Sequence, residues 1–333
     1  PYKIKSYGDI LKNPKDTIEF DEDSDHQIRQ KRDEIGADGA LLQTKDGNIY
    51  RVNLIEKILA TVLAKLSNLI PEGGIWMNTQ RPEWNDANNA LVGNGVSMVT
   101  LYYLRRFFNF FEELLADTTI DEVEISNEIF DFFNRVLETF ENNKDLLSSS
   151  INDIDKKAIL DSLGEAGSDY RNHIYNHAFS GRKSTLSISK LKDFITISKS
   201  YLEHSIRANK RSDSLYHAYN LMTVNDDNSV SISYLSEMLE GQVAGLSSGY
   251  LNSKEALQVL NALNESKLFR ADQYSYMLYP NKELKGFLDR NTISEDAIYS
   301  SKLLQEWLKD GKVQIVERDV NGEYHFNGNF RNA

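Results

Sequence analysis

The sequence predicts an all-α fold, a toroid or partial toroid of helical hairpins with a small β-hairpin near the C-terminus. Three observations predict it. Apolar residues recur at helical spacing along most of the chain, the turns between these windows are short, and residues 96–115 are apolar on nearly every side. An α-solenoid accounts for the first two observations. A toroid of concentric helices also accounts for the third, because its inner helices are covered on all sides.

The first clear helix is predicted over residues 54–70, where apolar side chains keep the i, i+3, i+4 spacing. Pro71 and the pair Gly73–Gly74 end this helix, because proline and glycine both interrupt helical backbone. An irregular loop follows, and the next helix is expected to begin near Asn88.

The stretch of residues 96–115 is the most apolar in the chain, yet Arg105 and Arg106 lie in its middle. Two charges near the centre of a bilayer would be costly, so we expect a buried helix and no membrane span. The other helical windows are residues 122–143, 152–178, 187–208, 231–248, 253–265 and 294–309.

This pattern predicts three parts: an N-terminal segment of mixed structure over residues 1–50, a helical-hairpin toroid domain over residues 51–310, and a tail over residues 311–333. The tail contains KVQIVERDVNGEYHF, in which Asn321–Gly322 separates two alternating runs. Such a dipeptide is a strong signal for a β-hairpin.

The composition argues against several classes of protein. A net charge of -12 and a pI of about 5.1 disfavour a general nucleic-acid binder and docking on an anionic membrane. Cysteine is absent, so disulfides and thiolate metal sites are excluded. The sequence has no glycine-rich phosphate cradle and no nucleophile elbow, which disfavours nucleotide-dependent chemistry and esterase chemistry, and we expect no cofactor. The chain opens on Pro1 without a signal peptide, which leaves the compartment open with a cytoplasmic location preferred, and indicates a piece of a longer protein.

Residues 81–95, RPEWNDANNALVGNG, place a tryptophan among amides and acids at the start of a helix. Asp86 can serve as the N-cap, but one helix needs only one cap and this stretch offers several. An indole face packs on the C–H patches of a sugar ring, while amides, carboxylates and arginine bind its hydroxyls. We therefore interpret the stretch as a saccharide subsite, with the candidate residues Arg81, Glu83, Trp84, Asn85, Asn88 and Asn89.

The segment WNDANN resembles the Trp-Asn-Asp segment of the cellobiose and chitobiose phosphorylases and, more loosely, the matching loop of the processing α-glucosidases and trehalases. These are six-hairpin glycosidase-like enzymes with an (α/α)6 toroid. The resemblance implies that Asp86 is the general acid that protonates the glycosidic oxygen and that Trp84 and Asn85 contact the sugar. Ala87 stands where the phosphorylases carry glycine, which favours hydrolysis of an oligosaccharide or glucan-like substrate over phosphorolysis.

Hydrolysis needs a second carboxylate, either as a base for water or as a nucleophile. Glu240 is the candidate, because it lies in a helix of small residues that allow close packing. An ordinary surface glutamate is the competing interpretation. Asp272, in a loop late in the chain, is a further candidate.

The segment DSLYHAYNLM adds three candidate substrate-binding residues, Tyr216, His217 and Asn220. Polar aromatic side chains on a loop can line a sugar pocket. An ordinary packed loop with satisfied hydroxyls explains them equally well.

Asp169, His173 and His177 share one helical face at i, i+4 and i+8. Histidines at i, i+4 can bind zinc, but no HExxH motif and no obvious fourth ligand accompany them. Partly exposed helix histidines are the favoured interpretation, and no metal is expected.

A glycoside hydrolase with a saccharide substrate is therefore the predicted function, with no nucleic-acid or membrane partner. A non-catalytic helical scaffold or sugar-binding module, in which Asp86 only caps its helix, is the competing function. A glycoside phosphorylase is a further alternative. A partial toroid would also expose apolar surface, which predicts association into a homo-oligomer.

Overall fold

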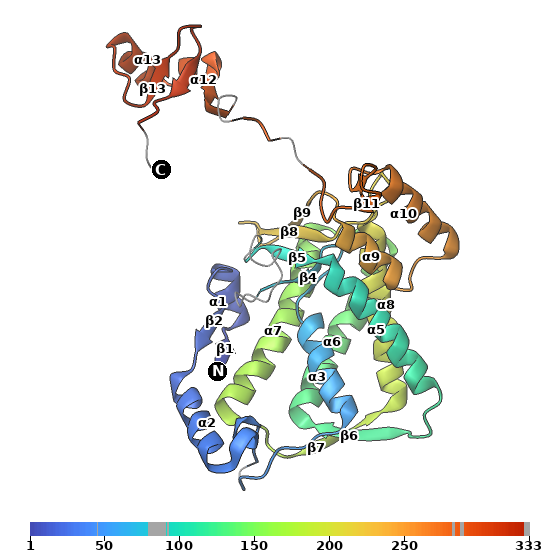
Figure 1. The fold of residues 1–333 in the computed structure, drawn as a ribbon. Helices are drawn as coiled ribbons and strands as arrows, with labels where there is room; N and C mark the ends of the chain where they lie inside the picture. The colour runs from blue at the N-terminus through green and yellow to red at the C-terminus, as the bar shows by residue number, and fades with distance from the viewer. Residues whose placement is uncertain (45, 79–90, 92, 282–283, 287–289, 330–333) are drawn as a thin grey trace. The chain divides into compact units, whose positions relative to one another are not determined.

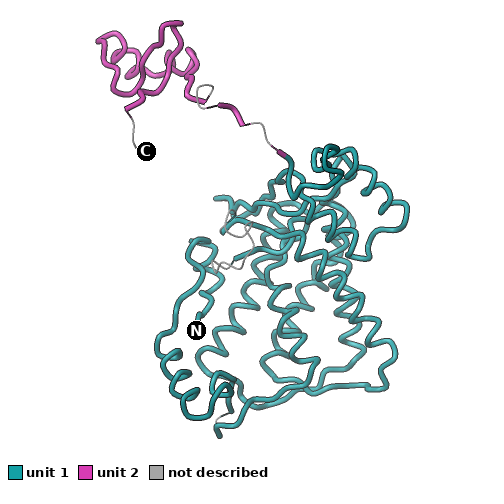
Figure 2. The backbone as a smooth tube through the Cα atoms, viewed as in Figure 1, with its two compact units in different colours: residues 1–280 teal, residues 281–333 magenta. Residues whose placement is uncertain are grey.

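The computed structural model describes residues 1–44, 46–78, 91, 93–281, 284–286 and 290–329. The chain divides into two compact units, Pro1–Pro280 and Asn281–Ala333 (Figure 2). Each unit has a hydrophobic core of its own. The domain boundaries near residues 50 and 310 stay predictions, since the division after Pro280 concerns compactness alone.

The first unit begins with short, alternating elements. Strand β1 (Tyr2–Ile4) pairs antiparallel with β2 (Ile18–Phe20), and helix α1 (Tyr7–Lys12) lies between them in sequence. Helix α2 (Glu22–Ile35) and the 3-10 helix η1 (Gly36–Ala40) follow. No side chain of α2 is buried, which agrees with its many charged residues.

Helices form the body of the first unit (Figure 1). Their bounds are α3 (Leu54–Leu66), α5 (Met98–Ala116), α6 (Asn127–Asn142), η2 (Lys144–Ser148), α7 (Asp153–His177), α8 (Ile188–Ala208), α9 (Leu239–Ser247) and α10 (Ser253–Glu265). Four of them meet in the main core, where Leu63, Tyr102, Phe133 and Phe194 are fully buried. Apolar side chains at i, i+3 and i+4 share one helix face, which is why these four helices bury the faces that carry them.

Helix α5 corrects one expectation, because it is not buried on all sides. Its residues Leu101 and Phe108 are fully buried, whereas Phe110 and Leu114 are more than half exposed. The charge in its middle is paired, since the nearly buried Arg105 donates to Glu203 Oε1 at 2.8 Å and to the Ser248 carbonyl at 3.0 Å. No helix among the described residues is long and apolar enough to cross a membrane.

The predicted all-α fold class is wrong, because the first unit contains a five-stranded antiparallel sheet. Its strands are β3 (Leu69–Ile70), β4 (Gly74–Trp76), β5 (Gly95–Ser97), β8 (Tyr219–Val224) and β9 (Val230–Tyr234), in the order β3-β4-β5-β8-β9. The sheet lies across one end of the helices, and the pair β6 (Glu122–Ser126) and β7 (Lys183–Ser187) lies at the other end (Figure 1). A further short pair is β10 (Phe269–Arg270) with β11 (Ser275–Tyr276).

The strands of the first unit were not predicted from the sequence because several of them run directly into a helix. The windows predicted as helix over residues 122–143 and 187–208 each begin with strand residues, and the helices start only at Asn127 and Ile188. In β6 the side chains of Val123 and Ile125 are shielded between exposed glutamates, which is the two-residue alternation of a strand. So short an alternation is also compatible with the start of an amphipathic helix.

The second unit is small and mixed. Helices α12 (Glu295–Ser300) and α13 (Lys302–Lys309) accompany a three-stranded sheet of β12 (Thr292–Ile293), β14 (Tyr324–Phe326) and β13 (Val316–Arg318). Ile298, Val316 and Tyr324 form its core. The β-hairpin predicted around Asn321–Gly322 is confirmed, because β13 and β14 pair on either side of it and Gly322 has a φ of 89°.

Candidate functional site

The stretch of residues 81–95 connects two neighbouring strands of the five-stranded sheet, β4 and β5. The Met77 N–H donates to the Gly95 carbonyl at 2.9 Å, and the indole N–H of Trp76 donates to the Gly93 carbonyl at 2.9 Å. The two ends of the connecting segment therefore leave the sheet side by side.

Most of the predicted saccharide residues lie in this segment, outside the described residues. The predicted general acid is Asp86, and the predicted sugar contacts there are Arg81, Glu83, Trp84, Asn85, Asn88 and Asn89. Their roles stay predictions.

The base of the segment is held by packing against the N-terminal part of the chain. Trp76 is buried, and its ring meets the ring of Tyr7 edge to face with centroids 6.4 Å apart. Gly93 has a φ of 88°, and a Cβ there would come within 2.8 Å of the Pro14 carbonyl oxygen. Only glycine accommodates both the backbone angle and the close approach, so a side chain at position 93 would push this end of the segment away from Pro14.

Tyr216 and His217, predicted to contact the sugar, are tied into the fold. The Tyr216 N–H donates to Gln242 Oε1 at 2.8 Å, and Gln242 Nε2 donates back to the Tyr216 carbonyl at 2.7 Å. Burial raises the pKa of the Tyr216 phenol to about 12. The His217 ring stacks on Tyr234 with centroids 4.4 Å apart, and burial lowers the pKa of His217. These contacts favour packing as the role of both residues, and sugar contact stays a prediction.

Asn220, the third predicted contact from this stretch, is fully buried in β8. Its Nδ2 donates to the Gly73 carbonyl and to Asn209 Oδ1, each at 2.8 Å. Asn209 Nδ2 in turn donates to the Glu72 carbonyl at 2.7 Å. Asn220 therefore links β8 to the turn between β3 and β4.

That turn contains a buried carboxylate, Glu72, which the sequence analysis did not single out. Its Oε1 lies 3.1 Å from His204 Nε2 and accepts the Ile151 N–H at 3.0 Å, and its Oε2 lies 3.1 Å from Lys156 Nζ. The side chain is 8% exposed, and the residue has a φ of 62°. The sequence signal that could have identified Glu72 is its position as a lone charged residue between two apolar runs in LIPEGGIW.

The donors around Glu72 decide its charge. Burial alone would raise the pKa of this carboxyl, but the hydrogen bonds from His204, Ile151 and Lys156, with the charge of Lys156, lower it to about 2. Glu72 is therefore ionised at neutral pH, with donors on both oxygens. Such a group anchors a turn and is poorly suited to proton transfer.

Glu240, the predicted second carboxylate, lies in the first turn of α9 and is partly exposed. The Tyr219 hydroxyl donates to its Oε2 at 2.9 Å. Tyr219 pairs with Ser97 of β5, the strand that receives the predicted saccharide segment. The catalytic role of Glu240 stays a prediction. The other candidate, Asp272, is exposed and held by Arg270 at 2.6 Å.

A serine–lysine pair also lies in the first unit, where Lys183 Nζ, on a partly exposed side chain, is 3.0 Å from both the buried Ser126 Oγ and Glu56 Oε2. A serine–lysine nucleophile requires a neutral lysine as the base. Burial lowers the pKa of Lys183, but the hydrogen bond and charge of Glu56 outweigh burial and raise it. The lysine stays charged, so this group is an ion pair that joins α3 to the β6–β7 pair.

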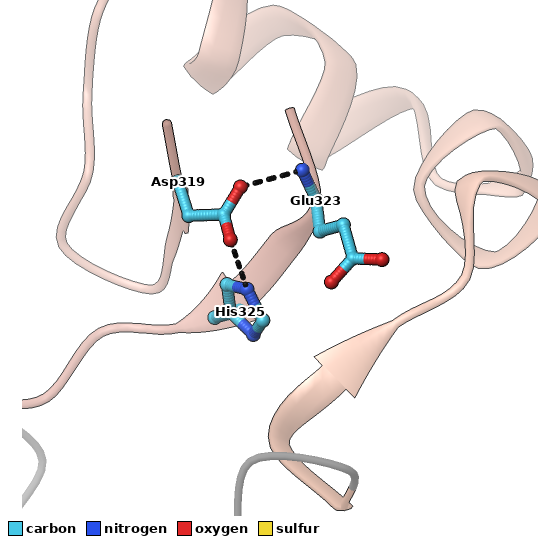
Figure 3. Close-up of side chains that lie close together, drawn as sticks. All are labelled: Asp319, Glu323 and His325. Carbon is cyan, nitrogen blue, oxygen red and sulfur yellow. Dashed lines mark hydrogen bonds and ion pairs between the residues drawn. The ribbon is translucent and has the colours of Figure 1, made fainter. Parts of the chain in front are cut away.

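In the second unit, Asp319, Glu323 and His325 gather at the β13–β14 hairpin (Figure 3). Among the described residues they are the one group of three acids and histidines whose possible metal-binding atoms all lie within 4.8 Å of one another. Both oxygens of Asp319 are already engaged, because Oδ1 accepts the Glu323 N–H at 2.8 Å and Oδ2 lies 3.2 Å from His325 Nε2. These contacts are sufficiently explained by closure of the hairpin turn.

Comparison with known proteins adds one finding. Residues 284–333 match the family model described as GH149 phosphorylase insertion domain 2. No curated protein matches the chain. The family match supports a relationship to the glycoside phosphorylases and to carbohydrate metabolism, and it gives no support to the six-hairpin toroid in particular.

Proposed function

We propose that this chain belongs to a glycoside phosphorylase, an enzyme that cleaves a glycosidic bond with inorganic phosphate. The observation that carries the proposal is the match of residues 284–333 to a phosphorylase insertion domain. The segment Trp84-Asn85-Asp86, which resembles the cellobiose and chitobiose phosphorylases, lies in a different part of the chain. Two segments without common residues therefore support the same class of enzyme.

This proposal replaces hydrolysis, which the sequence alone favoured. In phosphorolysis an oxygen of phosphate attacks the anomeric carbon, and the bond between that carbon and the glycosidic oxygen breaks. The general acid gives its proton to the departing glycosidic oxygen. The products are a sugar 1-phosphate and a saccharide shortened by that sugar. Phosphate is itself an anionic nucleophile, so no carboxylate is needed to activate water, as hydrolysis with inversion would require.

The residue roles in the proposal follow from this chemistry. Asp86 is the general acid, and Trp84 offers an apolar face for the sugar ring. The side chains of Arg81, Glu83, Asn85, Asn88 and Asn89 offer hydrogen bonds to hydroxyls. Glu240 is dispensable for phosphorolysis and would be essential for hydrolysis, which makes it the residue that distinguishes the two reactions.

The experiment compares wild type, Asp86→Asn and Glu240→Gln on a panel of oligosaccharides with and without phosphate, followed by NMR of the anomeric protons. We expect sugar 1-phosphate to form only with phosphate, a loss of about 10²–10⁴-fold in rate for Asp86→Asn, and retained turnover for Glu240→Gln. Phosphate-independent release of reducing sugar that needs both carboxylates would identify a hydrolase. Sugar binding without turnover, equal in all three proteins, would instead identify the non-catalytic module.

A further inference from the structure

A cavity of about 270 Å³ lies between α6 and α7, and its lining includes Glu128, Tyr170, His173 and Arg182. The last turn of α7 and the segment that follows it lead toward β7, at the end of the helices opposite the five-stranded sheet (Figure 1). The proposed phosphorylase function does not use this region.

Glu128 is the unusual group in this cavity. Its side chain is 7% exposed, and its Oε1 accepts the Ser180 N–H at 2.8 Å. Its Oε2 is buried and has no hydrogen-bond partner in the part of the chain that the structure describes. A carboxylate oxygen is thus buried without a donor, which is costly unless something binds it.

One histidine of α7 lies next to this carboxylate. His173 Nε2 lies 4.0 Å from Glu128 Oε1, which is too far for a hydrogen bond. His177 follows one turn later, with its ring centroid 5.2 Å from that of His173. The sequence placed Asp169 on the same helix face as the two histidines, but Asp169 is paired with Arg135 at 2.7 Å. The fold brings Glu128 to His173 from another helix.

We propose that Glu128, His173 and His177 form a binding site for a divalent cation of the zinc type. Zinc binds histidine nitrogen and carboxylate oxygen at about 2.0–2.2 Å in a tetrahedral arrangement, so two of its ligand atoms lie about 3.4 Å apart. Glu128 Oε1 and His173 Nε2, now 4.0 Å apart, would have to move about 0.6 Å closer to bind one ion. His177 is exposed and reaches the ion by a change of side-chain rotamer, and water completes the coordination. The ion ties the start of α6 to the last turn of α7.

The surrounding charges are compatible with a cation. Arg135 is paired with Asp169 at 2.7 Å, and Asp131 and Arg182 bring opposite charges to the same lining. Glu128 Oε2 is the carboxylate oxygen of this lining that is buried without a hydrogen-bond partner among the described residues. The hairpin group of the second unit is a less suitable site, because the oxygens of Asp319 are already engaged.

The test is titration of the metal-stripped full chain with Zn²⁺ by calorimetry, repeated with Co²⁺ to record its absorption spectrum. We expect one ion per chain, at least tenfold weaker binding in Glu128→Gln, His173→Gln and His177→Gln, and unchanged binding in His325→Gln. Saturating zinc should also raise the Tm of wild type and not that of His173→Gln, since a ligand stabilises only the state that binds it.

His173 and His177 are exposed, so their variants fold even if Glu128→Gln does not. Zinc binding that survives both histidine substitutions would overturn the proposal. So would binding that is lost in His325→Gln, which would place the ion at the hairpin, or the absence of saturable binding to wild type.

Discussion

The imidazole Nε2 of His204 lies 3.1 Å from Oε1 of Glu72, a carboxylate that the fold buries in a turn with a left-handed backbone angle. Helix α8 supplies this histidine, and α7 supplies Lys156 to the other oxygen. One acidic side chain thus joins two helices to the first turn of the sheet. The stability of this turn should therefore depend on the negative charge of Glu72.

Replacing Glu72 with glutamine should lower the free energy of unfolding by about 1–3 kcal/mol, because Lys156 and His204 lose a charged partner while Lys156 keeps Asp153 at 3.2 Å. Urea unfolding measures the change. Glu138→Gln is the matched control, since Glu138 is exposed on α6 and should change stability by less than about 0.5 kcal/mol. Equal stability of the two variants would mean that Glu72 does not anchor the turn.

The stability of the protein should also depend on pH through Glu72. Its pKa is about 2 in the folded protein against an ordinary value of 4.5, so the unfolded chain takes up the proton first as the pH falls. The stabilisation, about 3 kcal/mol, is fully present above pH 4.5 and is lost between pH 4.5 and about 2. The difference in stability between wild type and Glu72→Gln should therefore shrink across this window. A difference that stays constant would contradict the assignment.

Asn220→Ala should destabilise the protein, because the Gly73 carbonyl and Asn209 Oδ1 each lose a donor inside the sheet. Leaving buried acceptors unsatisfied costs about 1–3 kcal/mol. Asn264→Ala, on the exposed face of α10, is the control and should be close to neutral. Unchanged stability together with a raised KM for the saccharide would instead make Asn220 a substrate ligand.

Two helix glycines should respond in opposite directions to alanine. A Cβ at Gly164 would come within 2.3 Å of the Tyr7 ring, so Gly164→Ala should destabilise by about 1–3 kcal/mol. A Cβ at Gly245 would meet nothing within 4 Å, so Gly245→Ala should stabilise α9 by up to about 1 kcal/mol. Thermal unfolding of both variants checks the pair. Destabilisation by Gly245→Ala would show that α9 tolerates no added side chain.

The helices were predictable where local signals mark their ends. Residues 152–178 and 253–265 were predicted as helices, and α7 and α10 have nearly those bounds, with the caps Asn152 and Asn252 bonded to backbone N–H groups. The hairpin at Asn321–Gly322 was predictable for the same reason.

The sheet was not predictable from local sequence, because its strands are two to six residues long and its two halves are joined by the pairing of β5 with β8, which lie far apart in the chain. Glu72 was missed for a related reason, since its partners His204 and Lys156 come from α8 and α7. The saccharide role of residues 81–95 was predicted from composition and a short resemblance, and it stays a prediction because most of these residues lie outside the described part of the chain.

The pairing of β5 with β8 has a consequence for how the protein reaches its native state. Val96 of β5 pairs with Asn220 of β8, and the helices that separate the two residues in the sequence are synthesised before this pair can form. The contact is therefore of long range. Contacts of long range form slowly, because the intervening chain must first lose its freedom. Strand β5, which follows the predicted saccharide segment, is therefore completed late, and a chain whose synthesis stopped before β8 would hold β5 through its pairing with β4 alone.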